Sequence, residues 1–110
     1  MIVDFDLPKN KNVSEIAVSC MESINVGFIL HPESISLYDI SNGSEKLISS
    51  ISIPKSDVDE PDSKKLFKLS LKQKNIKRVR LKINSNRSLP KGHVAEGQPA
   101  WVFVDEIFLL

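Results

Sequence analysis

An alternation of apolar and polar residues recurs along the chain and predicts β-strands. In RVRLKIN, the apolar Val79, Leu81 and Ile83 alternate with basic and amide side chains, and this period of two places them on one face of a strand. No segment has the 3.6-residue period of an amphipathic helix. With turn signals between the runs, the pattern predicts an all-β, antiparallel β-sandwich. The expected strands lie in IVDFDLP, EIAVSCM, FILHPESISLYDI, KLISSISIP, LFKLSLK, RVRLKIN and AWVFVDEIFLL.

The closing run from Ala100 to Leu110 is almost wholly apolar, interrupted only by Asp105 and Glu106. A central strand buried on both faces has this pattern, and so has a short buried helix. The β-branched and aromatic residues of the run favour the strand. We expect Trp101, at its start, to be a buried core tryptophan, and we expect Phe28 to belong to the core as well.

Composition narrows the classes of protein that the chain can belong to. One hundred and ten residues suit a single domain, and the net charge of +1 differs from the basic footprint of a nucleic-acid binder. The lysines of the second half are expected to form a solvated sheet face. No apolar run is long enough to span a membrane. Cys20 is the only cysteine, which excludes an internal disulfide and favours a small buried apolar role.

The beginning of the chain has no signal-peptide pattern, since Asp4 and Asp6 follow Met1 closely. IVDFDLP resembles the middle of a strand, so we expect residues 1–110 to be one domain that is a fragment of a longer chain. A sheet edge left open by a missing strand would invite pairing with a second chain, and a dimer through such an edge is one alternative.

Three stretches carry features beyond alternation, and the third is the most specific. It holds an arginine-bearing strand, a Leu-Pro loop with a histidine, and a Trp–apolar–apolar–apolar–Asp-Glu-Ile strand. In this order the stretches resemble the discoidin, or coagulation-factor type C, domain. They are similar to the version at the C-terminal end of some bacterial β-N-acetylhexosaminidases. The stretches are IVDFDLPKNKNVSEIAVSC, FILHPESISLYDIS and KRVRLKINSNRSLPKGHVAEGQPAWVFVDEIFLL.

The resemblance implies a galactose-binding-like jelly roll and a role outside catalysis. The family's first strand would be missing here or belong to an upstream segment. The chain would be a carbohydrate-binding module of an extracytoplasmic glycoside hydrolase, in a secreted, periplasmic or cell-surface protein. The alternative is a structural or protein-interaction domain that packs against a neighbouring catalytic domain and has no glycan ligand. Phe28 departs from the family pattern, since relatives often carry tryptophan there.

Loops at one end of a rigid sandwich often carry the ligand, which directs attention to the long connection after Ile83. His93, Asn84, Asn86 and Arg87 are the candidate ligand-binding residues there, and His31 beside Pro32 is a further candidate. Each has a structural alternative. His93 can bond to backbone, the asparagines can cap their own turns, and Arg87 can be a solvated surface residue.

Glu106 is the one candidate metal ligand, because the resemblance implies a structural calcium site at a glutamate of the last strand. Calcium takes six to eight oxygen ligands, which a single carboxylate cannot supply. The alternative is that Glu106 pairs with Arg78 or Arg80. We expect no other cofactor.

No motif marks a catalytic site, and we expect no enzyme activity. The acidic loop DVDEPD has four carboxylates without a partner base, a pattern typical of solvated surface.

Overall fold

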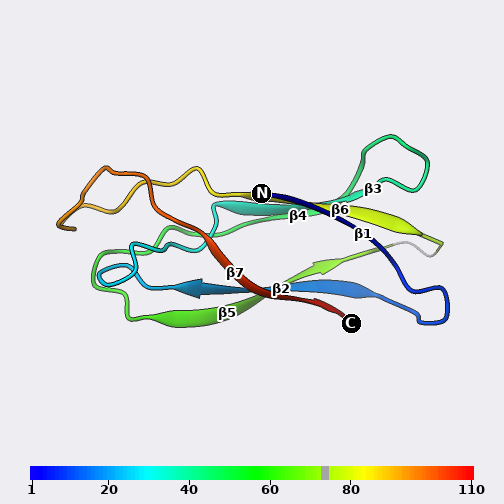
Figure 1. Cartoon of the computed structure of the whole chain (residues 1–110), viewed down its shortest axis with the longest axis horizontal. Coiled ribbons are helices and arrows are strands. Elements are labelled where there is room, and N and C mark those ends of the chain that lie inside the picture. Colours follow the sequence, from blue (N-terminus) through cyan, green and yellow to red (C-terminus); the bar gives the residue numbers. More distant parts are fainter. Residues whose placement is uncertain (73–74) are drawn as a thin grey trace.

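The computed structural model describes residues 1–72 and 75–110, and their regular structure is entirely β. Seven antiparallel strands form two sheets that face each other as a β-sandwich (Figure 1). The expected all-β fold and the seven strands are therefore confirmed. The strands are β1 (Ile2–Asp6), β2 (Glu15–Glu22), β3 (Ser34–Asp39), β4 (Lys46–Ser52), β5 (Ser63–Ser70), β6 (Arg78–Asn84) and β7 (Phe103–Leu109). The described residues form no helix that could cross a membrane.

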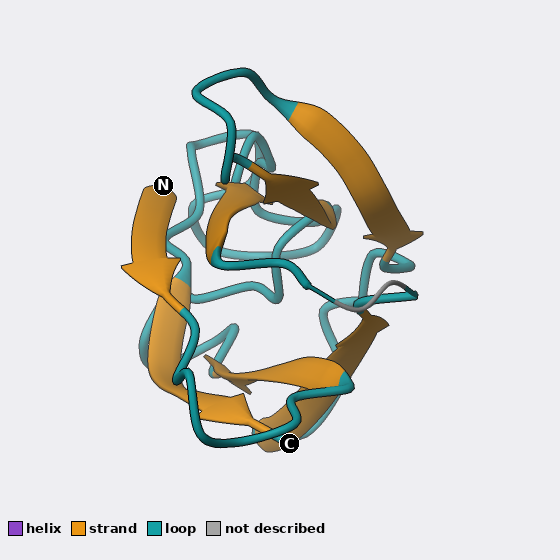
Figure 2. Ribbon diagram, turned by 90° about the vertical axis from the view of Figure 1, so that its right-hand side faces the viewer, coloured by secondary structure: helices purple, strands orange, loops and turns teal. Residues whose placement is uncertain are grey.

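One sheet has four strands in the order β1-β6-β3-β4, and the other has three in the order β5-β2-β7. The edge strands β4 and β5 contact each other, so β1 and β7 flank the opposite side of the sandwich. Figure 2 shows the two sheets as separate layers, with the three-stranded sheet below. Asn42-Gly43 belongs to the expected turn between β3 and β4, and Gly43 has the positive φ of 83° that favours glycine.

The core lies between the two inner faces and follows the predicted alternation. From the four-stranded sheet, β6 contributes Val79, Leu81 and Ile83, all buried. From the opposite sheet, β2 contributes Ile16, Val18 and Cys20, also buried. Strands with a strict period of two bury every second side chain when a second sheet covers one face.

Burial makes the Cys20 thiol inert, and it raises the pKa of that thiol to about 11. Because the thiolate is the reactive form, we expect a thiol reagent at neutral pH to modify folded protein very slowly. Added urea should accelerate the modification in step with the loss of β-sheet circular dichroism. Rapid labelling of fully folded protein would contradict the buried position of Cys20.

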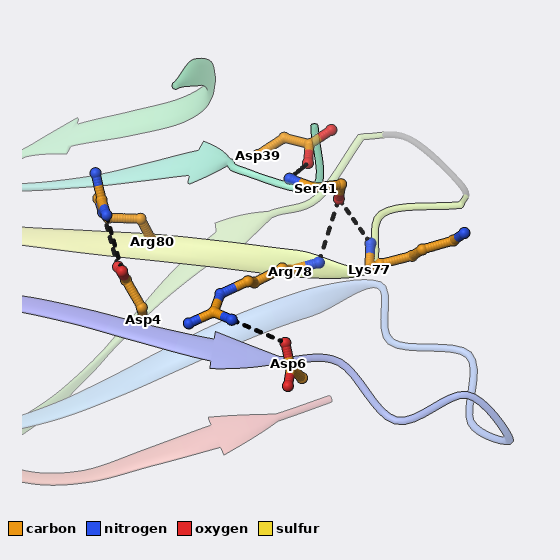
Figure 3. A network of polar contacts seen from close by, with 7 residues as sticks. All are labelled: Asp4, Asp6, Asp39, Ser41, Lys77, Arg78 and Arg80. Atoms are coloured by element: carbon orange, nitrogen blue, oxygen red, sulfur yellow. Dashed lines mark hydrogen bonds and ion pairs between the residues drawn. The ribbon is translucent and has the colours of Figure 1, made fainter. Parts of the chain in front are cut away.

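The outer face of the four-stranded sheet carries several paired charges. Arg80 donates from Nε to Asp4 Oδ1 at 2.7 Å and from Nη2 to Asp4 Oδ2 at 2.8 Å, while Arg78 lies 3.8 Å from Asp6 (Figure 3). The hydrogen bond from Arg80 holds the pKa of the Asp4 carboxyl below its usual value. These contacts join β1 to β6 across the sheet. Exposed pairs of this kind contribute little to stability.

The closing run forms the expected strand, β7, but the expected central position of that strand was wrong. The strand β7 lies at the edge of the three-stranded sheet, and β2 holds the central position. The small Ala17 and Ser19 of β2 are covered by larger neighbours on either side, whereas Phe103 and Phe108 of β7 remain partly exposed. The position of a strand in the sheet is set by the strands that pair with it, and an apolar run does not determine that position.

Candidate functional site

An open groove of about 650 Å³ lies on the side of the sandwich that β1 and β7 flank. Its walls come from the start of β1, the end of β6, residues 84–86 and residues 99–102. Trp101, Asn84 and Asn86 are among the lining residues. The groove therefore brings one large aromatic side chain, from just before β7, together with two amide side chains from the end of β6.

Trp101 is exposed to 73% of its surface, and the expectation that it is buried in the core was wrong. Its backbone is nevertheless fixed, because its N–H donates to the carbonyl oxygen of Phe28 and its own carbonyl accepts the N–H of Leu30, both at 3.0 Å. The next residue, Val102, packs against the core. Since neighbouring residues of extended chain point to opposite sides, the inward Val102 leaves Trp101 outward.

The two asparagines are exposed at the end of β6. The backbone N–H of Asn86 donates to Asn84 Oδ1 at 3.1 Å, so Asn84 makes the turn that was expected as its structural alternative. Among the described residues, no partner is found for the amide nitrogen of Asn84 or for either polar atom of the Asn86 side chain. These groups remain free to bond to a ligand. Lys82 also lines the groove, but its Nζ donates to Glu45 at 2.6 Å and lies 4.8 Å from the ring centroid of Tyr38.

The long connection after β6 is itself ordered by backbone pairing. Arg87 accepts from Ala100 at 2.9 Å, and Leu89 donates to Gln98 at 2.8 Å. An isolated bridge joins Ser88 to Pro99 between these two bonds. The connection thus doubles back on itself, which carries Trp101 toward the residues that follow β6.

His93 lies beyond this paired stretch, and its ring is buried. Nε2 donates to the carbonyl oxygen of Ile24 at 2.8 Å, which makes Nδ1 the acceptor for the N–H of Ala95 at 2.9 Å. The ring also packs edge-on against Phe28, with centroids 4.8 Å apart. His93 therefore has the backbone-bonded role that was its structural alternative. Phe28 was expected in the core, but its side chain is only partly buried. Its backbone has a positive φ of 57°.

Arg87 and His31 belong to a buried polar cluster, not to the groove. The guanidinium of Arg87 donates to the carbonyl oxygen of His31 at 3.2 Å and to that of Ile53. The His31 ring is buried, with Nε2 3.1 Å from Ser63 Oγ. Among the predicted residues, Asn84 and Asn86 are thus the ones that a ligand in the groove can reach.

The centre of this cluster is Glu22, which sequence reasoning missed. Its side chain is 2% exposed, and it accepts Ser56 Oγ at 2.6 Å and the backbone N–H of His31 at 2.9 Å. The alternation along β2 that points Val18 and Cys20 inward also points Glu22 inward, and that signal was available in the sequence. Glu22 joins three segments at the same end of the sandwich as the groove.

The pKa of His31 is lowered, mainly because burial desolvates the ring. The Glu22 carboxylate acts in the opposite direction, whereas Lys65 and Arg87 lower the pKa further. The folded state therefore binds fewer protons at this ring than the unfolded chain, whose histidine pKa is about 6.5. We expect the free energy of unfolding to fall as the pH drops below about 6.5 toward the lower pKa of folded His31.

Urea unfolding at a series of pH values from about 8 down to about 5 measures this effect. The variant His31→Gln should show a shallower pH dependence over the same interval, since it removes the titrating ring. A wild-type stability that is constant or rising as the pH falls would contradict the expectation.

Glu106 lies on the outer face of the three-stranded sheet, opposite Ser19. The alternative that it pairs with Arg78 or Arg80 was wrong, because those arginines pair with Asp6, Asp4 and Glu45.

The neighbour of Glu106, Asp105, forms an ion pair with Lys64 at 2.7 Å. The described residues contain no group of three His, Cys, Asp or Glu side chains close enough to hold a metal ion.

A second depression, of about 490 Å³, lies at the other end of the sandwich, near Pro8 and Leu71. None of the described residues that line it is aromatic, and none was a predicted site residue. The groove beside Trp101 is therefore the better candidate for a binding site. No protein-family model matches the chain, and no curated protein matches it either.

Proposed function

We propose that the domain is a noncatalytic carbohydrate-binding module whose ligand sits over Trp101. The observation that carries the proposal is the exposed indole beside the free amide groups of Asn84 and Asn86. A sugar ring has an apolar face that stacks on an aromatic ring, and its hydroxyls take hydrogen bonds from planar polar groups. An open groove supports a weak complex, with a Kd of about 1 mM for a single sugar.

The resemblance to discoidin domains points the same way. On that resemblance, the sandwich would be a galactose-binding-like jelly roll attached to an extracytoplasmic glycoside hydrolase such as a β-N-acetylhexosaminidase. Its location would be secreted, periplasmic or at the cell surface. The module itself would have no catalytic activity, and it would hold its enzyme close to glycans.

The proposal is tested by following backbone amide signals in NMR while galactose, N-acetylgalactosamine and N-acetylglucosamine oligomers are added. We expect one of these sugars to cause saturable shifts confined to residues 82–86 and 99–102. The variant Asn86→Ala should weaken that response several-fold, because it removes hydrogen bonds at the rim of the groove.

The matched control is Asn25→Ala. The Asn25 side chain is exposed and donates to the carbonyl oxygen of Val58 at 3.0 Å, outside the groove. Sugar binding should be unchanged in this variant. Shifts that centre on other residues, or no shifts at millimolar sugar with folded protein, would overturn the proposed site.

The second candidate function is a structural or protein-interaction domain. A different surface favours it, namely the partly exposed apolar side chains on the outer face of the three-stranded sheet. The two functions use separate surfaces, so variants in the groove and variants on that face distinguish them.

A further inference from the structure

Arg87 comes directly after Asn86, but it does not line the groove. Its side chain is partly buried, and among the described residues its guanidinium bonds only to backbone carbonyl oxygens. These are the carbonyls of His31, Ile53 and Pro54. No described carboxylate forms an ion pair with Arg87. The guanidinium therefore joins the start of the long connection to the segments that precede β3 and follow β4.

Three hydrogen bonds link Arg87, Trp101 and the segment before β3 in a closed ring. The carbonyl oxygen of Arg87 accepts the N–H of Ala100 at 2.9 Å. The carbonyl oxygen of Trp101 accepts the N–H of Leu30 at 3.0 Å. The guanidinium of Arg87 closes the ring by donating to the carbonyl oxygen of His31 at 3.2 Å. Because the ring closes through neighbouring residues, a shift of any one of the three segments disturbs its bonds to the other two.

The ring sets the spacing across the groove. On one side, Asn86 is the residue before Arg87, and the N–H of Arg87 donates to the carbonyl oxygen of Ser85 at 2.7 Å. On the other side, Trp101 is tied to Arg87 through the bond at Ala100. A sugar ring that stacks on the indole and bonds to the amide needs both groups at one distance. Binding sites of this kind depend on supporting residues that hold the contact groups within about 0.5 Å.

The charge of Arg87 strengthens this support. Burial lowers the pKa of the guanidinium, and the carboxylates of Glu33 and Glu22 oppose that effect without cancelling it. Arginine nevertheless stays charged in proteins, and hydrogen bonds from a charged donor are stronger than those from a neutral one. Its planar fork reaches carbonyls of two segments at once, which the single ammonium of lysine does not reproduce.

We propose that Arg87 is a positioning residue of the groove, which fixes Asn86 and Trp101 at the spacing that one sugar ring requires and does not itself touch the sugar. The inference rests on the proposed sugar site. Its mechanical part, the hold of Arg87 on the segment of Trp101, is measurable with no sugar present.

Sugar titrations of variants test the role in binding. Arg87→Lys keeps the positive charge but lacks the planar fork, so it should bind sugar about tenfold more weakly than wild type. Arg87→Ala should lose at least as much. About 20 mM guanidinium chloride, far below the molar concentrations that unfold proteins, should restore part of the affinity of Arg87→Ala, and sodium chloride should not. Arg78→Ala is the matched control, because this exposed arginine lies beside Asp6 outside the groove, and its affinity should equal that of wild type.

Amide hydrogen exchange without sugar measures the ring itself. Val18 serves as the reference, because it is buried in the central strand of its sheet. Relative to Val18, exchange at the N–H groups of Ala100 and Trp101 should become about fivefold faster in Arg87→Lys. Taking the ratio separates a local loosening of the ring from a general loss of stability.

Three results would overturn the proposal. One is an exchange ratio that keeps its wild-type value in Arg87→Lys, and another is wild-type sugar affinity in both Arg87 variants. The third is a loss in Arg87→Ala on which guanidinium and sodium act alike, since that loss would come from general weakening of the fold. A raised exchange ratio in a protein whose wild type binds no sugar would support the hold on Trp101 and overturn the sugar site instead.

Discussion

Replacing Glu22 by alanine is expected to lower the free energy of unfolding by about 3 kcal/mol. The carboxylate is buried and accepts hydrogen bonds from the Ser56 hydroxyl and from the backbone N–H of His31. Alanine leaves both donors without an acceptor, and a buried donor without a partner costs about 1–3 kcal/mol. A small cavity adds to the loss.

Urea unfolding measures this difference, and two further variants define its cause. Glu22→Gln keeps the size of the side chain and one acceptor oxygen, so it should cost about half as much as alanine. Glu60→Ala removes an exposed glutamate from the loop before β5 and should change stability by less than about 0.5 kcal/mol. Equal stabilities of Glu22→Ala and Glu60→Ala would show that the buried cluster has no net stabilising effect.

The second large effect is expected on sugar binding. Trp101→Ala should weaken the response to sugar about tenfold or more, because it removes the stacking surface of the groove. The melting curve should change little, since most of the Trp101 surface is exposed and its backbone bonds remain. Binding and stability are thereby separated in one variant.

Phe108→Ala is the control for Trp101→Ala. Phe108 is also a partly exposed aromatic residue of the C-terminal segment, but it does not line the groove. Its replacement should leave the sugar response intact. A Trp101→Ala protein that binds sugar as well as wild type would remove the tryptophan from the proposed site.

Local pattern predicted the strands because the inward side chains repeat every second residue. Val79, Leu81 and Ile83 illustrate this, and all three are buried as expected. The same local rule does not determine the order of strands in a sheet. The position expected for β7 was wrong for this reason: β2 is the central strand, and β7 is partly exposed because it lies at the edge.

The site was harder to predict because its contacts join distant residues. The ring of His93 is held by the carbonyl oxygen of Ile24, sixty-nine positions away, and no local pattern indicates that bond. Asn84 and Asn86 could be selected from the sequence because loop position and amide chemistry are local properties. Trp101 was misjudged by residue type, although its alternation with the inward Val102 indicated an outward side chain.

The fluorescence of Trp101 tests the central claim most directly, because it is the only tryptophan in the chain. Its emission reports on the groove without any label while N-acetylglucosamine, N-acetylgalactosamine or galactose oligomers are added to wild-type protein. A sugar that stacks on the indole displaces water from it, so we predict a saturable shift of the emission to shorter wavelength for one of these sugars. Emission that stays unchanged for all of them at millimolar concentration, while circular dichroism shows folded protein, would contradict carbohydrate binding at this groove.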